Sequence, residues 1–177
     1  PEELAEGKPF IWQAVMEGRT LYQKPGLPPL DREGAAMRYD PREEAQPWFE
    51  RAEEDLAVAR LLLRGSHFRV ACFHCQQAIE KALKAYLYAQ GQRREPGHDL
   101  RKMCARAARF HSAFRELRPQ LAFFEGFYTG TRYPNAGRRR GEPPMVFDEG
   151  VAREALQRSE RVLELVQEQL RPPEQTA

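Results

Sequence analysis

Apolar residues recur at steps of three and four along most of the chain, which is the spacing of one face of an α-helix. The first such row has charged residues between its apolar members, which are Phe49, Ala52, Leu56, Ala59 and Leu63. Gly65 is expected to end this helix, and Ser66 is a residue type that caps the next one. That second helix is predicted to run to Gly91.

Further helical stretches follow in the second half of the chain. Asp99 offers an N-cap for a third helix, and a fourth stretch spans about 112–128, although Pro119 must kink, break or start it. Asp148 is expected to cap a last helix whose apolar face ends at Leu170. No segment alternates with period two for long. We therefore predict an all-α fold, an antiparallel four- or five-helix bundle with an N-terminal extension.

The first forty residues differ in composition from the rest of the chain. The segment "KPGLPPLDREG" concentrates proline and glycine, which is typical of a linker. We predict an N-terminal extension and linker at 1–40, the helical bundle at 41–172 and a disordered tail at 173–177.

Charge and composition narrow the function only slightly. The chain has 177 residues and a net charge of +2, a balance too even to imply nucleic-acid binding by itself. No run approaches the roughly eighteen apolar residues of a membrane span. The odd number of cysteines, 3, fits a reducing compartment better than a disulfide framework. We expect a cytoplasmic protein without a membrane partner.

Cys72 and Cys75 lie one helical turn apart with His74 between them, a spacing that suggests metal or redox chemistry. A structural zinc site needs four converging ligands, and the remaining candidates are Cys104 and scattered histidines. We interpret the two cysteines as small packing residues and expect neither a metal nor a cofactor. They continue a stripe of small residues formed by Ala71, Cys75, Ala78, Ala82, Ala85 and Ala89.

The same helix carries a second apolar row, made of Ile79, Leu83 and Tyr86. Together the two rows give it more packing surface than one neighbouring helix needs. This predicts a homodimer formed partly through the bundle helices.

The polar part of this helix is more informative than its cysteines. Two amides, a carboxylate and two ammonium groups occupy adjacent rows, at Gln76, Gln77, Glu80, Lys81 and Lys84. Glu80 and Lys84 form a favourable (i, i+4) pair, so this could be a solvated face that pairs with itself. However, the chain strongly prefers arginine, and two of its few lysines lie one turn apart here. That bias favours a binding site.

Four pieces in order resemble the HEPN domain, a prokaryotic helical domain often encoded beside or fused to a minimal nucleotidyltransferase. They are the Trp48–Asp55–Leu56 opening, "QQAIEKALKA", the turn His98-Asp99-Leu100, and Arg132-Tyr133-Pro134. The resemblance spans about 45–170. It implies an antiparallel helical bundle, usually dimeric, that binds a nucleotide or RNA.

The first forty residues contain "PFIWQAVMEGRTLYQ", which is similar to the tail of those minimal nucleotidyltransferases. Such an enzyme needs a Gly-Ser turn followed by an Asp-x-Asp pair that holds magnesium. Gly65-Ser66 is followed by no such pair, and none occurs elsewhere in the chain. We therefore expect no nucleotidyl transfer by this chain itself. The catalytic part could lie upstream, the segment could be a remnant, or it could be an unrelated arm.

Some HEPN proteins resemble metal-independent ribonucleases with an Arg-x(4–6)-His motif. Four pairs have this spacing here, Arg60/His67, Arg69/His74, Arg93/His98 and Arg106/His111, but arginine is so frequent that the spacing says little. In that branch the motif lies about where Arg132-Tyr133-Pro134 stands, and no histidine follows His111. The sequence thus favours a domain with no catalytic residues. A ribonuclease with a rearranged Arg/His site and a pure protein-assembly domain remain alternatives.

The loop after the fourth helical stretch supplies guanidinium groups beside an aromatic ring, a combination suited to nucleotides or single-stranded RNA. We interpret the arginines at 138–140 as a solvated loop, and Arg132 with Tyr133 as functional because the resemblance includes them. The predicted nucleotide- or RNA-binding residues are Lys81, Lys84, His98, Arg132 and Tyr133. The expected partner is a minimal nucleotidyltransferase in a toxin–antitoxin-type pair.

Overall fold

The computed structural model describes residues 40–92, 97–136 and 145–171, and within these ranges it is helical, with no strand. Its elements are α3 (Pro41–Arg64), α4 (Phe68–Ala89), α5 (Leu100–Ala107), α6 (Phe114–Gln120), the 3₁₀-helix η2 (Leu121–Phe124), α7 (Phe127–Gly130) and α8 (Glu149–Leu170). The predicted all-α bundle is therefore confirmed. Among the described helices, none is long and apolar enough to cross a membrane.

Three of the sequence-based predictions lie outside the described residues. They concern the N-terminal segment as far as residue 39, the arginines at 138–140 and the tail at 173–177. The division into domains therefore stays a prediction.

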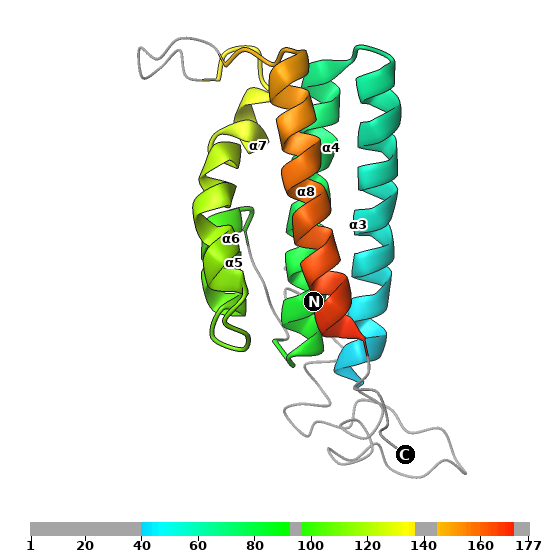
Figure 1. The fold of residues 1–177 in the computed structure, drawn as a ribbon, viewed down its shortest axis with the longest axis vertical. Coiled ribbons are helices and arrows are strands. Elements are labelled where there is room, and N and C mark those ends of the chain that lie inside the picture. The colour runs from blue at the N-terminus through cyan, green and yellow to red at the C-terminus, as the bar shows by residue number, and fades with distance from the viewer. Residues whose placement is uncertain (1–39, 93–96, 137–144, 172–177) are drawn as a thin grey trace, which may run out of the picture. The chain divides into compact units, whose positions relative to one another are not determined.

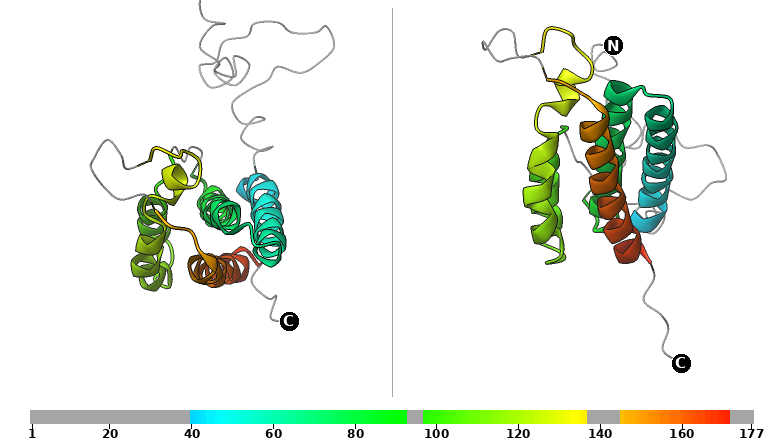
Figure 2. Two further views of the ribbon diagram at one scale, coloured as in Figure 1. Left: turned by 90° about the horizontal axis from the view of Figure 1, so that it is seen from above. Right: turned by 45° about the horizontal axis from the view of Figure 1, so that its top comes forward.

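Helix α4 lies at the centre of the bundle. It contacts α3 and α8 along its length and also packs against α5 and α7. Seen end-on in Figure 2, α4 stands between α3 on one side and the α5–α7 segments on the other, and α8 completes the bundle. The three long helices run side by side in Figure 1. Side chains of α4 can thus contribute both to the core and to the junction with α7.

The stripe of small residues on α4 forms the contact with its neighbours. Ala71, Cys75, Ala78, Ala82 and Ala85 are each at most 1% exposed, and Ser159 of α8 donates a hydrogen bond to the Cys75 carbonyl. Burial raises the pKa of Cys72 and of Cys75 to about 12, so both thiols stay protonated at neutral pH. The interpretation of these cysteines as packing residues is confirmed.

The second apolar row of α4 is also buried within the single chain. Ile79 and Leu83 are 0% exposed, and the Tyr86 ring packs against Phe114 of α6 with 4.4 Å between ring centroids. The packing surface that this row adds is therefore used within the single chain, and it does not itself support a dimer. The homodimer itself stays a prediction.

The turn between α3 and α4 differs from the predicted one. Ser66, not Gly65, adopts the left-handed conformation, with φ of 59°. The amides of Ser66 and His67 donate to the carbonyls of Leu63 and Leu62, which is the Schellman pattern that closes a helix C-terminus. Ser66 therefore ends α3 and does not cap α4, whose N-cap residue is His67 without a side-chain cap bond.

The other two predicted caps are confirmed. Asp99 accepts a hydrogen bond from the Lys102 amide, and Asp148 accepts one from the Val151 amide. The predicted stretch at 112–128 is divided, because the chain tightens into η2 after Pro119 and turns at Gly126, where φ is 83°. This turn directs α7 back toward α4.

Candidate functional site

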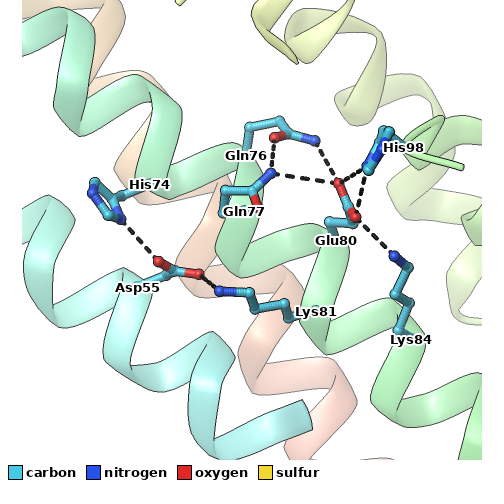
Figure 3. A network of polar contacts seen from close by, with 8 residues as sticks. All are labelled: Asp55, His74, Gln76, Gln77, Glu80, Lys81, Lys84 and His98. Atoms are coloured by element: carbon cyan, nitrogen blue, oxygen red, sulfur yellow. Dashed lines mark hydrogen bonds and ion pairs between the residues drawn. The ribbon is translucent and has the colours of Figure 1, made fainter. Parts of the chain in front are cut away.

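A buried carboxylate organises the polar face of α4. Glu80 is 4% exposed and lies 2.8 Å from the Lys84 ammonium. The Nδ1 atom of His98, at the start of the loop into α5, lies 2.9 and 3.0 Å from the two Glu80 oxygens. Gln76 and Gln77 add amide donors to the same carboxylate (Figure 3).

These partners keep Glu80 ionised inside the protein. Burial alone would raise the pKa of the Glu80 carboxyl, but hydrogen bonds from Lys84 and His98 outweigh that cost and hold this pKa below its ordinary value. An ionised carboxylate can only accept hydrogen bonds, so His98 donates its Nδ1–H to Glu80. This bond leaves Nε2 as the ring nitrogen that does not contact Glu80.

A second carboxylate, that of Asp55 on α3, also has a lysine and a histidine as partners. Asp55 lies in the buried face of α3 and pairs with the Lys81 ammonium through one oxygen. Its other oxygen lies 2.8 Å from Nδ1 of His74. Figure 3 shows the two groups on opposite sides of the α4 surface, with Gln77 between them. Both lysines are therefore bound to carboxylates.

Arg132 lies against the aromatic residues that join these two groups. Its guanidinium carbon is 4.0 Å from the ring centre of Tyr128 and 4.8 Å from that of Phe73. The Tyr128 ring also stacks on His98, with 4.1 Å between centroids and 17° between planes. Because the imidazole covers one face of Tyr128, the guanidinium takes the other. Within the described part of the chain, this guanidinium has neither a carboxylate partner nor a hydrogen bond.

The backbone beside Arg132 is fixed from α4. The Arg69 guanidinium donates to the carbonyl of Thr131, the residue before Arg132. The Thr131 side chain is buried and donates to the Phe127 carbonyl at 2.6 Å. The Arg69 bond ties the end of α7 to the start of α4, and the Thr131 bond closes the last turn of α7 itself. Together they place Arg132 beside the aromatic rings.

The structure brings three of the five predicted site residues into one connected group. Lys84 and His98 share Glu80, and Arg132 joins His98 through Tyr128. Lys81 belongs instead to the Asp55 group. Tyr133 is 56% exposed and makes no ring contact among the described residues.

Lys84 and Arg132 differ in solvent exposure, and therefore in the role that each can take. The Lys84 side chain is only 10% exposed and approaches the Trp48 ring at 5.3 Å, so its ammonium serves Glu80. Arg132 is partly exposed, and its N–H donors are unengaged by the described residues. The guanidinium is therefore the cation best placed to meet a ligand.

Sequence analysis gave Asp55 only as part of the family resemblance, weighed Arg69 and His74 only in motifs that it set aside, and assigned no role to Phe73 or Tyr128. A signal existed for Asp55, because it lies beside Leu56 in the buried row of α3, where an unpaired carboxylate would be costly. No comparable signal existed for Tyr128, whose contacts depend on the turn at Gly126. Of the spaced Arg/His pairs, Arg60 binds Glu160 of α8 and Arg69 binds Thr131, so these arginines serve to hold the bundle together.

Comparison with known proteins agrees with this architecture. The family model of the HEPN domain matches residues 45–169. A relative from Methanocaldococcus jannaschii, described as "Putative toxin MJ1304", is 31% identical in an alignment of 136 residues that covers 72% of this chain and 88% of the relative.

Two solved structures are similar over most of the bundle. The crystal structure of TT1696 from Thermus thermophilus is 29% identical, with a TM-score of 0.61 over 70% of this chain and 96% of that one. The structure of ST0689, described as an archaeal HEPN homologue, is 29% identical, with a TM-score of 0.56 over 72% and 98% of the two chains. The chain belongs to the HEPN domain family, as its four sequence pieces indicated.

Proposed function

We propose that this HEPN domain is a non-catalytic module that binds the phosphate of a nucleotide or of RNA on Arg132. The observation that carries the proposal is the state of its guanidinium, which lies between two aromatic rings and has no carboxylate partner in the described ranges. A guanidinium that is already oriented can offer two parallel N–H donors to a phosphate. Lys84 and Glu80 act behind it, by holding His98 and thus the Tyr128 ring.

The test is the affinity of Arg132→Ala for a short, labelled oligoribonucleotide and for nucleotides. We expect binding to weaken by roughly 1.5–3 kcal/mol, as for hydrogen bonds to charged groups, with little change in melting temperature. Arg109→Ala is the matched control, since Arg109 is an exposed arginine after α5. Equal affinity of both variants would reject the proposal, and a large fall in the melting temperature of Arg132→Ala would make Arg132 a structural residue.

A ribonuclease is the second candidate, and the Glu80–His98 pair supports it. A carboxylate on Nδ1 leaves Nε2 able to accept a proton from a ribose 2′-hydroxyl, while Arg132 could hold the scissile phosphate. Incubation of RNA with the protein in EDTA distinguishes the two. Cleavage that His98→Ala abolishes would replace the binding proposal, whereas intact RNA supports it.

We further propose that the domain works in a toxin–antitoxin-type pair with a minimal nucleotidyltransferase, in the cytoplasm. Support comes from family membership and from the archaeal relative whose name describes a toxin. Sequencing the adjacent or upstream reading frame tests the partner. A Gly-Ser turn followed by Asp-x-Asp is expected there, and co-expression should then yield a complex of the two proteins. An assembly domain without its own ligand would form the complex but bind no nucleotide.

A homodimer is the last part of the proposal, and its support is the family resemblance. Sedimentation at micromolar concentration should show twice the mass of 20.5 kDa. Monomer alone at these concentrations would reject it.

A further inference from the structure

A pocket adjoins the His98–Tyr128 pair on the side of α5 and η2. Its volume is about 350 Å³, within the range of small-molecule sites. Leu100, Leu121 and Phe124 give it an apolar floor, and His98 and Tyr128 form one wall. These three floor residues are almost fully buried, so the floor is part of the folded core. An apolar floor beside an imidazole suits a flat aromatic ring such as a nucleobase.

Cations gather around the same pocket. Arg101, Lys102 and Arg118 line it together with two acidic residues. Lys102 lies 3.3 Å from Asp99, and Arg101 lies 3.7 Å from Glu125, in exposed pairs that water screens strongly. Arg118 has no ion pair within the ranges that the structure describes. The pocket therefore offers one unpaired guanidinium to an anion.

The pocket and Arg132 both contact the Tyr128 ring. Arg132 covers one face of Tyr128, while Tyr128 and the stacked His98 line the pocket. Arg132 thus lies against one member of a stacked pair of aromatic rings, and the pocket beside that pair has a second guanidinium, that of Arg118, in its lining. A single nucleic-acid strand likewise alternates phosphates, which suit guanidinium groups, with flat bases, which suit an apolar pocket.

We infer that the pocket holds a base of a single-stranded nucleic acid, with the phosphate on one side bound by Arg132 and the next one by Arg118. This inference rests on the proposed function and narrows its ligand from any nucleotide to a strand with at least two phosphates. A free mononucleotide can occupy only one of the two cationic centres.

Fluorescence anisotropy with short single strands, read as a function of salt, tests the inference. Each phosphate contact that is lost should reduce the slope of log affinity against log salt by about 0.7 for a single strand. Arg118→Ala should show this reduction and weaken strand binding about tenfold. Arg115→Ala is the control, since Arg115 is an exposed arginine of the same helix that does not line the pocket. The same titration, done once with RNA strands and once with DNA strands, identifies the sugar that the site prefers.

A second variant tests the base without changing charge. Ala105 lines the pocket and is partly exposed, so Ala105→Leu should fill part of the hollow in a folded protein. Strand affinity should fall while the salt slope stays as in wild type, because the substitution removes room for the base and no charge. If Arg118→Ala and Ala105→Leu both bind strands like Arg115→Ala, the pocket inference is overturned. If those two lose affinity and Arg132→Ala does not, the pocket stands and the phosphate site proposed for Arg132 fails.

Discussion

Two carboxylates in the bundle, Glu80 and Asp55, each have a lysine and an imidazole as partners. For Glu80, burial opposes the charge, yet the hydrogen bonds from Lys84 and His98 hold its pKa below the ordinary value. The folded-state pKa is thus lower than that of the unfolded chain. This carboxylate therefore stabilises the fold above the unfolded pKa, and the stabilisation is lost as the pH falls through the folded pKa.

Glu80→Gln should remove that pH dependence. At neutral pH we expect a loss of about 3 kcal/mol in the free energy of unfolding, because Lys84 then keeps its charge in a buried position. Urea unfolding from pH 7 to pH 3 should show a smaller decline for the variant than for the wild type. Glu154→Gln, which breaks an exposed pair with Arg158, should change stability by less than about 1 kcal/mol. Parallel pH profiles of Glu80→Gln and the wild type would contradict this account.

At the scale of the elements, the turns decide how helices meet. Ser66 closes α3 in the left-handed conformation, which costs a non-glycine residue about 1–2 kcal/mol. Ser66→Gly should therefore raise the free energy of unfolding by about 0.5–1 kcal/mol, after the greater chain entropy of glycine is counted. Chemical denaturation measures the change. A less stable variant would show that the Ser66 side chain stabilises the turn.

The junction of α4 with α7 depends on one arginine. Arg69→Ala removes the donor to the Thr131 carbonyl and should leave Arg132 less well oriented. We expect strand or nucleotide affinity to fall by about threefold to tenfold, since one hydrogen bond of a charged group is lost. Arg51→Ala, at an exposed position of α3, is the control. An unchanged affinity for Arg69→Ala would show that the aromatic rings alone orient Arg132.

At the scale of the whole molecule, the helices could be predicted from the sequence because their apolar spacing and two acidic caps are local signals. The site could be predicted only in part. Glu80–Lys84 follows from (i, i+4) spacing, whereas the stack of His98, Tyr128 and Arg132 depends on a turn at Gly126 that has no local signature. The burial of the second apolar row within one chain could not be predicted, because spacing along α4 does not reveal how many helices surround it.

The bundle should fold without the N-terminal segment. The described core residues lie between Phe49 and Val166, within the compact unit Pro41–Ala177. A chain that starts at Pro41 should unfold cooperatively, with a melting temperature within about 5 °C of the full chain, a shift that corresponds to about 1–2 kcal/mol. A non-cooperative transition would show that residues 1–40 complete the core.

The most direct test of the central claim is a crystal structure of the full chain with a short oligoribonucleotide. We predict a phosphate whose oxygens lie about 2.7–2.9 Å from the Arg132 guanidinium, while the arginine keeps its place between Phe73 and Tyr128. A phosphate bound instead by Lys81 or by the arginines at 138–140, with Arg132 free of the ligand, would contradict the account.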